Sequence, residues 1–269
     1  LALAYRELFV TDDSVLDYEK LDREATEARL IFIGFVVFQN KAKPESHPTI
    51  QLLNRAQILS KMVTGDNAVT AARVAKDVSM ISQTSEVYIC DLVEKDKTLN
   101  ILLTPLNTSF RRPETRIPVP LLDPLHKKDA SHQEENFSLD RAIETLISSF
   151  PKQFSSEIVY TGNALNFLLQ ATKKIKSNFN SQRVQESIYQ SKVFARMQPQ
   201  HKIQLIQFLQ SEGRIVAMVG DGANDCGALK AADVGLALSE AEASISAPFN
   251  SKVLNISGIL DLLREGRCT

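Results

Sequence analysis

A glycine-rich acidic turn at the end of an apolar segment is the feature that most constrains how this chain can fold. Residues 214–219 are mostly apolar and predict a buried parallel strand. Glycines then turn the chain, so Asp221 would lie at the carboxyl end of that strand, where open α/β sheets bind ligands. Asn224 and Asp225 stand where a helix would begin, and two carboxylates beside such a turn suit Mg²⁺ with a phosphate. A tight turn with a helix cap, needing no ligand, is the alternative.

A second strand-to-helix junction has the composition of an anion site. Residues 62–67, Met-Val-Thr-Gly-Asp-Asn, end one apolar segment and precede a helical stripe. A hydroxyl, a glycine and free backbone N–H groups at a helix N-terminus bind anions well. Asp66 or Asn67 could equally serve only to cap the helix, so this motif alone leaves both interpretations open.

Two basic residues fall near the same predicted sheet edge. Lys202 stands in the first turn of a helix predicted at Pro199–Leu209, on the same face as its buried apolar residues. A lysine is rarely buried without an anion, although its stem could instead run along the apolar face to solvent. Arg196 follows a predicted strand at Val193–Ala195 and is either a second cation of the site or an ordinary surface arginine. Together these groups could position and neutralise a transferred phosphoryl group.

Apolar segments and helical stripes alternate along most of the chain, which predicts a doubly wound, mostly parallel α/β sheet with helices on both faces. Residues 95–150 interrupt the pattern with prolines and a polar run, and we expect a partly disordered insertion there. His126 and His132, inside it, are expected to be solvated rather than metal-bound. The expected strands are Leu30–Phe38, Ile58–Val63, Val87–Leu92, Val193–Ala195, Arg214–Val219 and Val234–Leu238.

The composition argues against several functional classes. A formal net charge of −1 gives no reason to expect nucleic acid or an anionic membrane surface as a partner. Cys90, Cys226 and Cys268 lack Cys-x-x-Cys spacing and predict reduced thiols rather than disulfides or zinc ligands. The longest apolar run, Leu30–Phe38, is far shorter than the ~20 residues of a membrane helix. Because the sequence begins at Leu1 without Met, we expect it to be part of a longer protein.

The order of these motifs resembles the phosphorylation domain of P-type ATPases, which has the haloacid-dehalogenase-like fold. The resemblance rests on Thr-Gly-Asp-Asn at 64–67, on Lys202 with its preceding segment, and on Gly-Asp-Gly-Ala-Asn-Asp at 220–225. Asn-Lys-Ala-Lys-Pro-Glu at 40–45 stands where many ion pumps carry Asp-Pro-Pro-Arg. Residues 221–230 and 238–244 are similar to the type-five branch, which includes endolysosomal polyamine transporters.

The resemblance carries specific expectations for the site. It implies that Asp221 ligates Mg²⁺, that Asp225 orients its neighbours, and that Lys202 and Thr64 act with these carboxylates in catalysis. It implies ATP as substrate and a cation or polyamine as cargo, which membrane helices outside this sequence would carry. It also implies that this part of the protein lies at the cytosolic face of an endosomal, lysosomal or other endomembrane. It implies no nucleic-acid partner. The residues expected to contact nucleotide or phosphate are Thr64, Gly65, Asp66, Arg196, Lys202 and Asn224.

Departures from the family pattern matter as much as the match. The family's nucleophile motif, Asp-Lys-Thr-Gly-Thr, occurs nowhere in this sequence. In the family that motif lies on the central strand of the sheet, so we expect the chain to lack its nucleophile and one core strand, and to be inactive alone. Gln57 stands where the family usually has glycine. Lys61 lies in a segment that is normally apolar, which costs stability unless the ammonium group reaches water.

The resemblance also suggests an organisation and leaves rivals open. We expect a remnant of the nucleotide-binding domain and a linker at 1–28, and phosphorylation-domain parts at 29–94 and 151–269 around the insertion. A free-standing phosphatase of the same superfamily would need an Asp-x-Asp motif, and Asp12-Asp13 lacks that spacing. A non-catalytic product of a truncated gene is the other alternative.

Overall fold

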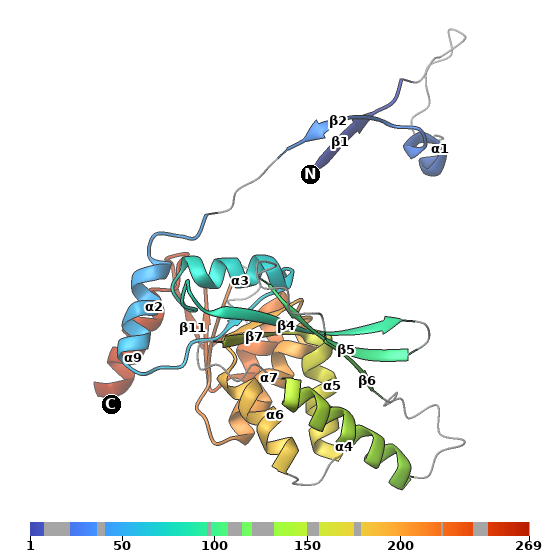
Figure 1. The fold of residues 1–269 in the computed structure, drawn as a ribbon. Helices are drawn as coiled ribbons and strands as arrows, with labels where there is room; N and C mark the ends of the chain where they lie inside the picture. Colours follow the sequence, from blue (N-terminus) through green and yellow to red (C-terminus); the bar gives the residue numbers. More distant parts are fainter. Residues whose placement is uncertain are drawn as a thin grey trace. The chain divides into compact units, whose positions relative to one another are not determined.

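The computed structural model describes residues 1–7, 22–36, 41–95, 98–106, 115–119, 132–149, 156–174, 179–221, 223–238 and 247–268. The chain divides into two compact units, Leu1–Lys41 and Ala42–Thr269 (Figure 1). Asp12-Asp13, His126 and residues 239–244 lie outside the described residues.

The first unit contains a two-stranded sheet and a short helix. β1 (Ala2–Tyr5) pairs antiparallel with β2 (Ile31–Phe35), and α1 (Arg23–Glu27) comes between them in sequence. The strand expected at 30–38 therefore forms, but it pairs with β1 and not with the mostly parallel sheet of the second unit. Apolar side chains on both strands are exposed, and Phe35 keeps 74% of its surface accessible.

A six-stranded, mostly parallel sheet organises the second unit, as the alternating pattern predicted. Its order is β3-β8-β7-β4-β5-β6; the first four strands run parallel, and β5 and β6 add antiparallel at one edge. Figure 1 shows α3 on one face of this sheet and α4 to α7 on the other. The strands are β3 (Met62–Val63), β8 (Val193–Ala195), β7 (Ser156–Thr161), β4 (Glu86–Lys95), β5 (Thr98–Pro105) and β6 (Thr115–Val119).

A second, three-stranded parallel sheet lies in the same unit. Its order is β11 (Phe249–Asn250), β10 (Val234–Ala237) and β9 (Ala217–Gly220). Within the described residues, no strand pairs with the outer edge of β9, and none pairs with the outer edge of β3. We call these the two open edges. The burial of the strands is consistent with these open edges. The interior strand β8 is fully buried, whereas β3 is only half-buried and Ala217 of β9 is exposed.

Helices bury two hydrophobic clusters against the sheets. One cluster contains Leu165, Leu168 and the stacked rings of Tyr160 and Phe194. The other joins both sheets, since Val193 of β8 and Leu236 of β10 belong to it. The helices are α2 (Ser46–Arg55), α3 (Ala68–Asp77), α4 (His132–Ser149), α5 (Gly162–Lys174), α6 (Phe179–Gln190), α7 (Pro199–Ser211), α8 (Cys226–Ala231) and α9 (Gly258–Cys268).

The predicted insertion contributes to the core where it is described. It contains β5, β6 and α4, and Ile101, Ile117 and Ile143 of these elements are at most 1% exposed. His132 is the first residue of α4. Among the described helices, none combines the length and the apolar character that crossing a membrane requires.

Candidate phosphate and magnesium site

The Thr64–Asp66 loop is held against the chain that follows β8. Thr64 N donates to Phe194 O at 2.9 Å, and Met197 N donates to Thr64 O at the same distance. Arg196 N donates to Asp66 O at 2.8 Å. The motifs 62–67 and 195–197, far apart in sequence, therefore form one backbone framework at the carboxyl ends of neighbouring parallel strands.

Two local features shape this loop. Asn67 caps α3 by accepting from Thr70 N at 2.9 Å, as the capping interpretation predicted. Arg196 has a φ of 50°, a left-handed conformation that is uncommon for residues other than glycine. We attribute this bend to the two hydrogen bonds that successive N–H groups make to the Thr64 loop. The Arg196 residue is exposed, and so are Gly65 and Asp66.

Lys202 is buried with an anion, and the anion belongs to the chain itself. Its Nζ lies 2.6 Å from Asp225 Oδ1, and both residues are 8% exposed. Lys202 comes from the helix after β8, whereas Asp225 follows β9, so the ion pair connects the two sheets. Gly220 leaves room for it, because a Cβ there would lie 2.8 Å from the Asp225 carboxylate. Removing one partner of such a pair leaves an uncompensated buried charge.

Asp221 offers an available carboxylate at the end of β9. It is exposed, and within the described residues no hydrogen bond or ion pair engages it. Asn224, also exposed, belongs to the short 3₁₀ turn Ala223–Asp225 that follows. The described residues contain no cluster of three His, Cys, Asp or Glu side chains. One free carboxylate fits Mg²⁺, which keeps several waters and takes its other oxygens from phosphate.

His201 is a residue of this region that the sequence did not single out. It is 7% exposed, and its Nδ1 accepts from Gln198 N at 3.4 Å, at the start of α7. Burial lowers the pKa of His201 and so favours the neutral ring, in which Nδ1 can act as the acceptor for Gln198 N. Its ring occupies the space beside Gly162, where a Cβ would clash with it. The available signal was its position three residues after the N-cap, where Glu or Gln completes a capping box.

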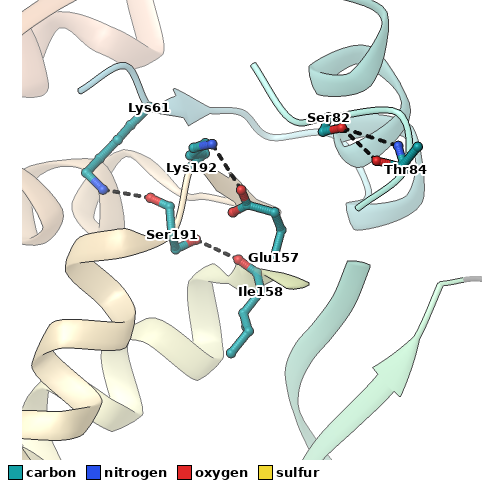
Figure 2. A network of polar contacts seen from close by, with 7 residues as sticks. All are labelled: Lys61, Ser82, Thr84, Glu157, Ile158, Ser191 and Lys192. Carbon is teal, nitrogen blue, oxygen red and sulfur yellow. Dashed lines mark hydrogen bonds and ion pairs between the residues drawn. The ribbon is translucent and has the colours of Figure 1, made fainter. Parts of the chain in front are cut away.

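Lys61, which was expected to cost stability unless its ammonium group reaches water, directs that group to backbone carbonyls. Nζ donates to Tyr189 O at 2.5 Å and to Ser191 O at 2.6 Å, at the end of α6. Figure 2 shows the contact with Ser191. Desolvation by burial lowers the pKa of Lys61 to about 8; Glu157 opposes this shift and Lys192 adds to it. Lys192 and Glu157 form an ion pair of 3.0 Å beside it. The lysine thus satisfies carbonyl groups that the helix end leaves without partners.

Curated proteins similar to this chain include P-type ATPases of the 13A family, the class to which the motifs pointed. The vacuolar cation-transporting ATPase YPK9 of Saccharomyces cerevisiae is 36% identical over 249 residues, covering 93% of this chain and 15% of the yeast protein. The polyamine-transporting ATPase 13A2 of Homo sapiens is 33% identical over 251 residues, covering 93% of this chain and 19% of the human protein. The probable cation-transporting ATPase 13A4 of Gallus gallus is 34% identical over 271 residues, covering 99% of this chain and 20% of the chicken protein. The chain thus spans a fifth or less of these relatives, and no family model matches it.

Proposed function

We propose that this chain is phosphorylation-domain sequence of a type-five P-type ATPase, in which ATP hydrolysis drives transport of a cation or polyamine. The observation that carries the proposal is the position of Thr64 and Asp221 directly after the two open edges, β3 and β9. The relatives named for cation or polyamine transport support the same conclusion. The sequence motifs and the fold are in keeping with it.

A single parallel strand between the two open edges would join both sheets into one. Parallel strands are normally buried between neighbours, so two parallel edges in one unit suit such an insertion. The residue that follows the inserted strand would lie between Thr64 and Asp221, because both come directly after their strands. In P-type ATPases the strand at this place carries the nucleophilic aspartate of Asp-Lys-Thr-Gly-Thr. Without that aspartate, the chain alone is expected to form no phosphoenzyme.

The residues of this chain would then have distinct roles. Asp221 would hold Mg²⁺, which when bound supplies positive charge to the phosphoryl oxygens. Lys202 and the Thr64 hydroxyl would neutralise and orient the phosphoryl group, with Asp225 holding the Lys202 ammonium in position. The remaining contacts to nucleotide or phosphate would come from Gly65, Asp66, Arg196 and Asn224.

Complementation with a peptide tests this proposal. The peptide contains a short apolar strand followed by Asp-Lys-Thr-Gly-Thr, and the ligand is beryllium fluoride, a mimic of the phosphoryl group. We expect calorimetry to show Mg²⁺-dependent binding of the mimic to the chain with peptide, and not to the chain alone. Asp221→Ala and Lys202→Met should abolish it, whereas Asp261→Ala, at an exposed carboxylate of α9, should not. Equal binding by the Asp221→Ala variant would refute the proposal.

A further inference from the structure

Tyr189, in the last turn of α6, contacts the chain that leads into both open edges. Lys61 immediately precedes β3, and its Nζ lies 5.5 Å from the centroid of the Tyr189 ring. Arg214 comes three residues before β9, and its Cζ lies 4.9 Å from the centroid of the same ring. Cations near the faces of aromatic rings are attracted by the ring quadrupole. One aromatic side chain thus attracts a cation from each of the two segments.

Further contacts fix each cation in place. Lys61 also donates to two carbonyl groups at the end of α6, and its Nζ lies 5.5 Å from the ring of Phe194 in β8. Arg214 N donates to Leu209 O, which sets where the chain turns from α7 towards β9. Tyr189 packs against the same hydrophobic cluster as Val63 of β3 and Val216, just before β9. The segments that lead into β3 and β9 therefore contact the same aromatic ring and the same hydrophobic cluster.

We propose that Tyr189, Lys61 and Arg214 form a clamp that sets the spacing of β3 and β9 at their amino ends. Paired strands lie about 4.8 Å apart, so a strand between the two edges requires them to be roughly 10 Å apart. At the carboxyl ends, the Lys202–Asp225 ion pair connects the same two sheets. The clamp and the ion pair together keep the edges at a separation that admits one strand. The identity of that strand rests on the proposed function, whereas the clamp itself does not.

Spin-label distances test the clamp directly. Labels at Leu59 and Ile215, which are 42% and 87% exposed, report the separation of the two entry segments. The labelled cysteines are introduced in a background in which Cys226 and Cys268 are serine. Tyr189→Leu keeps an apolar side chain and removes the ring, and it should broaden the distance distribution. Tyr189→Phe keeps the ring and should preserve the narrow wild-type distribution.

Two further measurements keep the test decisive. Arg214→Met, at an exposed position, removes one cation with little risk to folding and should also broaden the distribution. Tyr189→Leu should weaken binding of the strand peptide about tenfold, which corresponds to the loss of two cation–ring contacts. Unchanged distances in both Tyr189→Leu and Arg214→Met would overturn the clamp. Failure of the wild type to bind peptide would instead count against the proposed function, while the label distances still decide the clamp.

Discussion

Replacing Lys61 by methionine should remove a distinctive pH dependence from the stability of the chain. Burial lowers the pKa of Lys61 from 10.5 to about 8. The native state therefore holds the proton less tightly than the unfolded state, and unfolding free energy rises as the pH increases from about 8 to 10.5. One pKa unit corresponds to about 1.4 kcal/mol, so a difference of about 2.5 units raises the unfolding free energy by about 3 kcal/mol over this range. This value is an upper bound, because the hydrogen bonds to Tyr189 O and Ser191 O favour the charged form.

Urea unfolding followed by circular dichroism at pH 7, 8, 9 and 10 provides the measurement. Cys90 and Tyr160 also make stability depend on pH in this range, because burial raises their pKa values in the native state while the unfolded thiol and phenol titrate at their ordinary values. Their contributions cancel in the difference between wild type and Lys61→Met, which isolates Lys61. Lys252→Met, at an exposed position, serves as the matched control and should run parallel to the wild type. If Lys61→Met also runs parallel to the wild type from pH 7 to 10, the ammonium group is not desolvated in the native state and the reasoning fails.

Three further substitutions probe the backbone and the buried ion pair. Gln57 follows the end of α2 and has a φ of 58°, which glycine adopts more easily. Gln57→Gly should therefore raise the unfolding free energy by about 1 kcal/mol, and its melting temperature should exceed that of Gln57→Ala. Gly162→Ala would press a methyl group onto His201 and should cost about 1–3 kcal/mol in urea unfolding, with Gly266→Ala, where space is open, as the control. Asp225→Asn leaves the Lys202 charge buried without its carboxylate and should cost about 3–5 kcal/mol. The double variant with Lys202→Met should recover part of that loss, and no recovery would contradict a direct interaction.

The sequence predicted the elements whose signal is local. Uninterrupted apolar segments located β8, with the expected bounds, and β10 within one residue. The helical stripe after residue 67 and the helix predicted at Pro199–Leu209 correspond to α3 and α7 for the same reason. β3 is shorter than expected because Ile58 N bonds back to Leu53 O, so this residue still closes the end of α2. β7 was not predicted, although it is central to the sheet and its last three residues are buried.

Long-range pairing accounts for what the sequence could not predict. The motif order indicated that Thr64, Lys202 and Asp221 belong to one edge, but no local pattern shows that Lys202 is paired with Asp225. Similarly, the isolated lysine at 61 gave no indication of the carbonyl groups at the end of α6, more than a hundred residues later. The strand at Leu30–Phe38 was predicted from an apolar run alone, and such a run does not specify a partner strand. β2 pairs with β1 and remains exposed.

The open edges and the unfavourable residues near β3 make the stability of the chain sensitive to a bound strand. Gln57 is held in a left-handed conformation and Lys61 is desolvated, so the segment leading into β3 carries local costs. A ligand that binds only the native state stabilises it by about 2.7 kcal/mol at one hundred times its dissociation constant. That gain is comparable with the desolvation cost of Lys61. We therefore expect the strand peptide to raise the melting temperature of the wild type.

If the clamp sets the spacing of the edges, Lys61→Met should bind the same peptide more weakly than the wild type does. The peptide should therefore raise the melting temperature of Lys61→Met less than that of the wild type. A peptide with the same composition in scrambled order is the control and should leave both melting temperatures unchanged. Equal stabilisation by the scrambled peptide would mean that the edges accept any apolar segment. The two open edges would then bind apolar strands without sequence specificity, and the position of Thr64 and Asp221 beside them would no longer support a phosphoryl-transfer site.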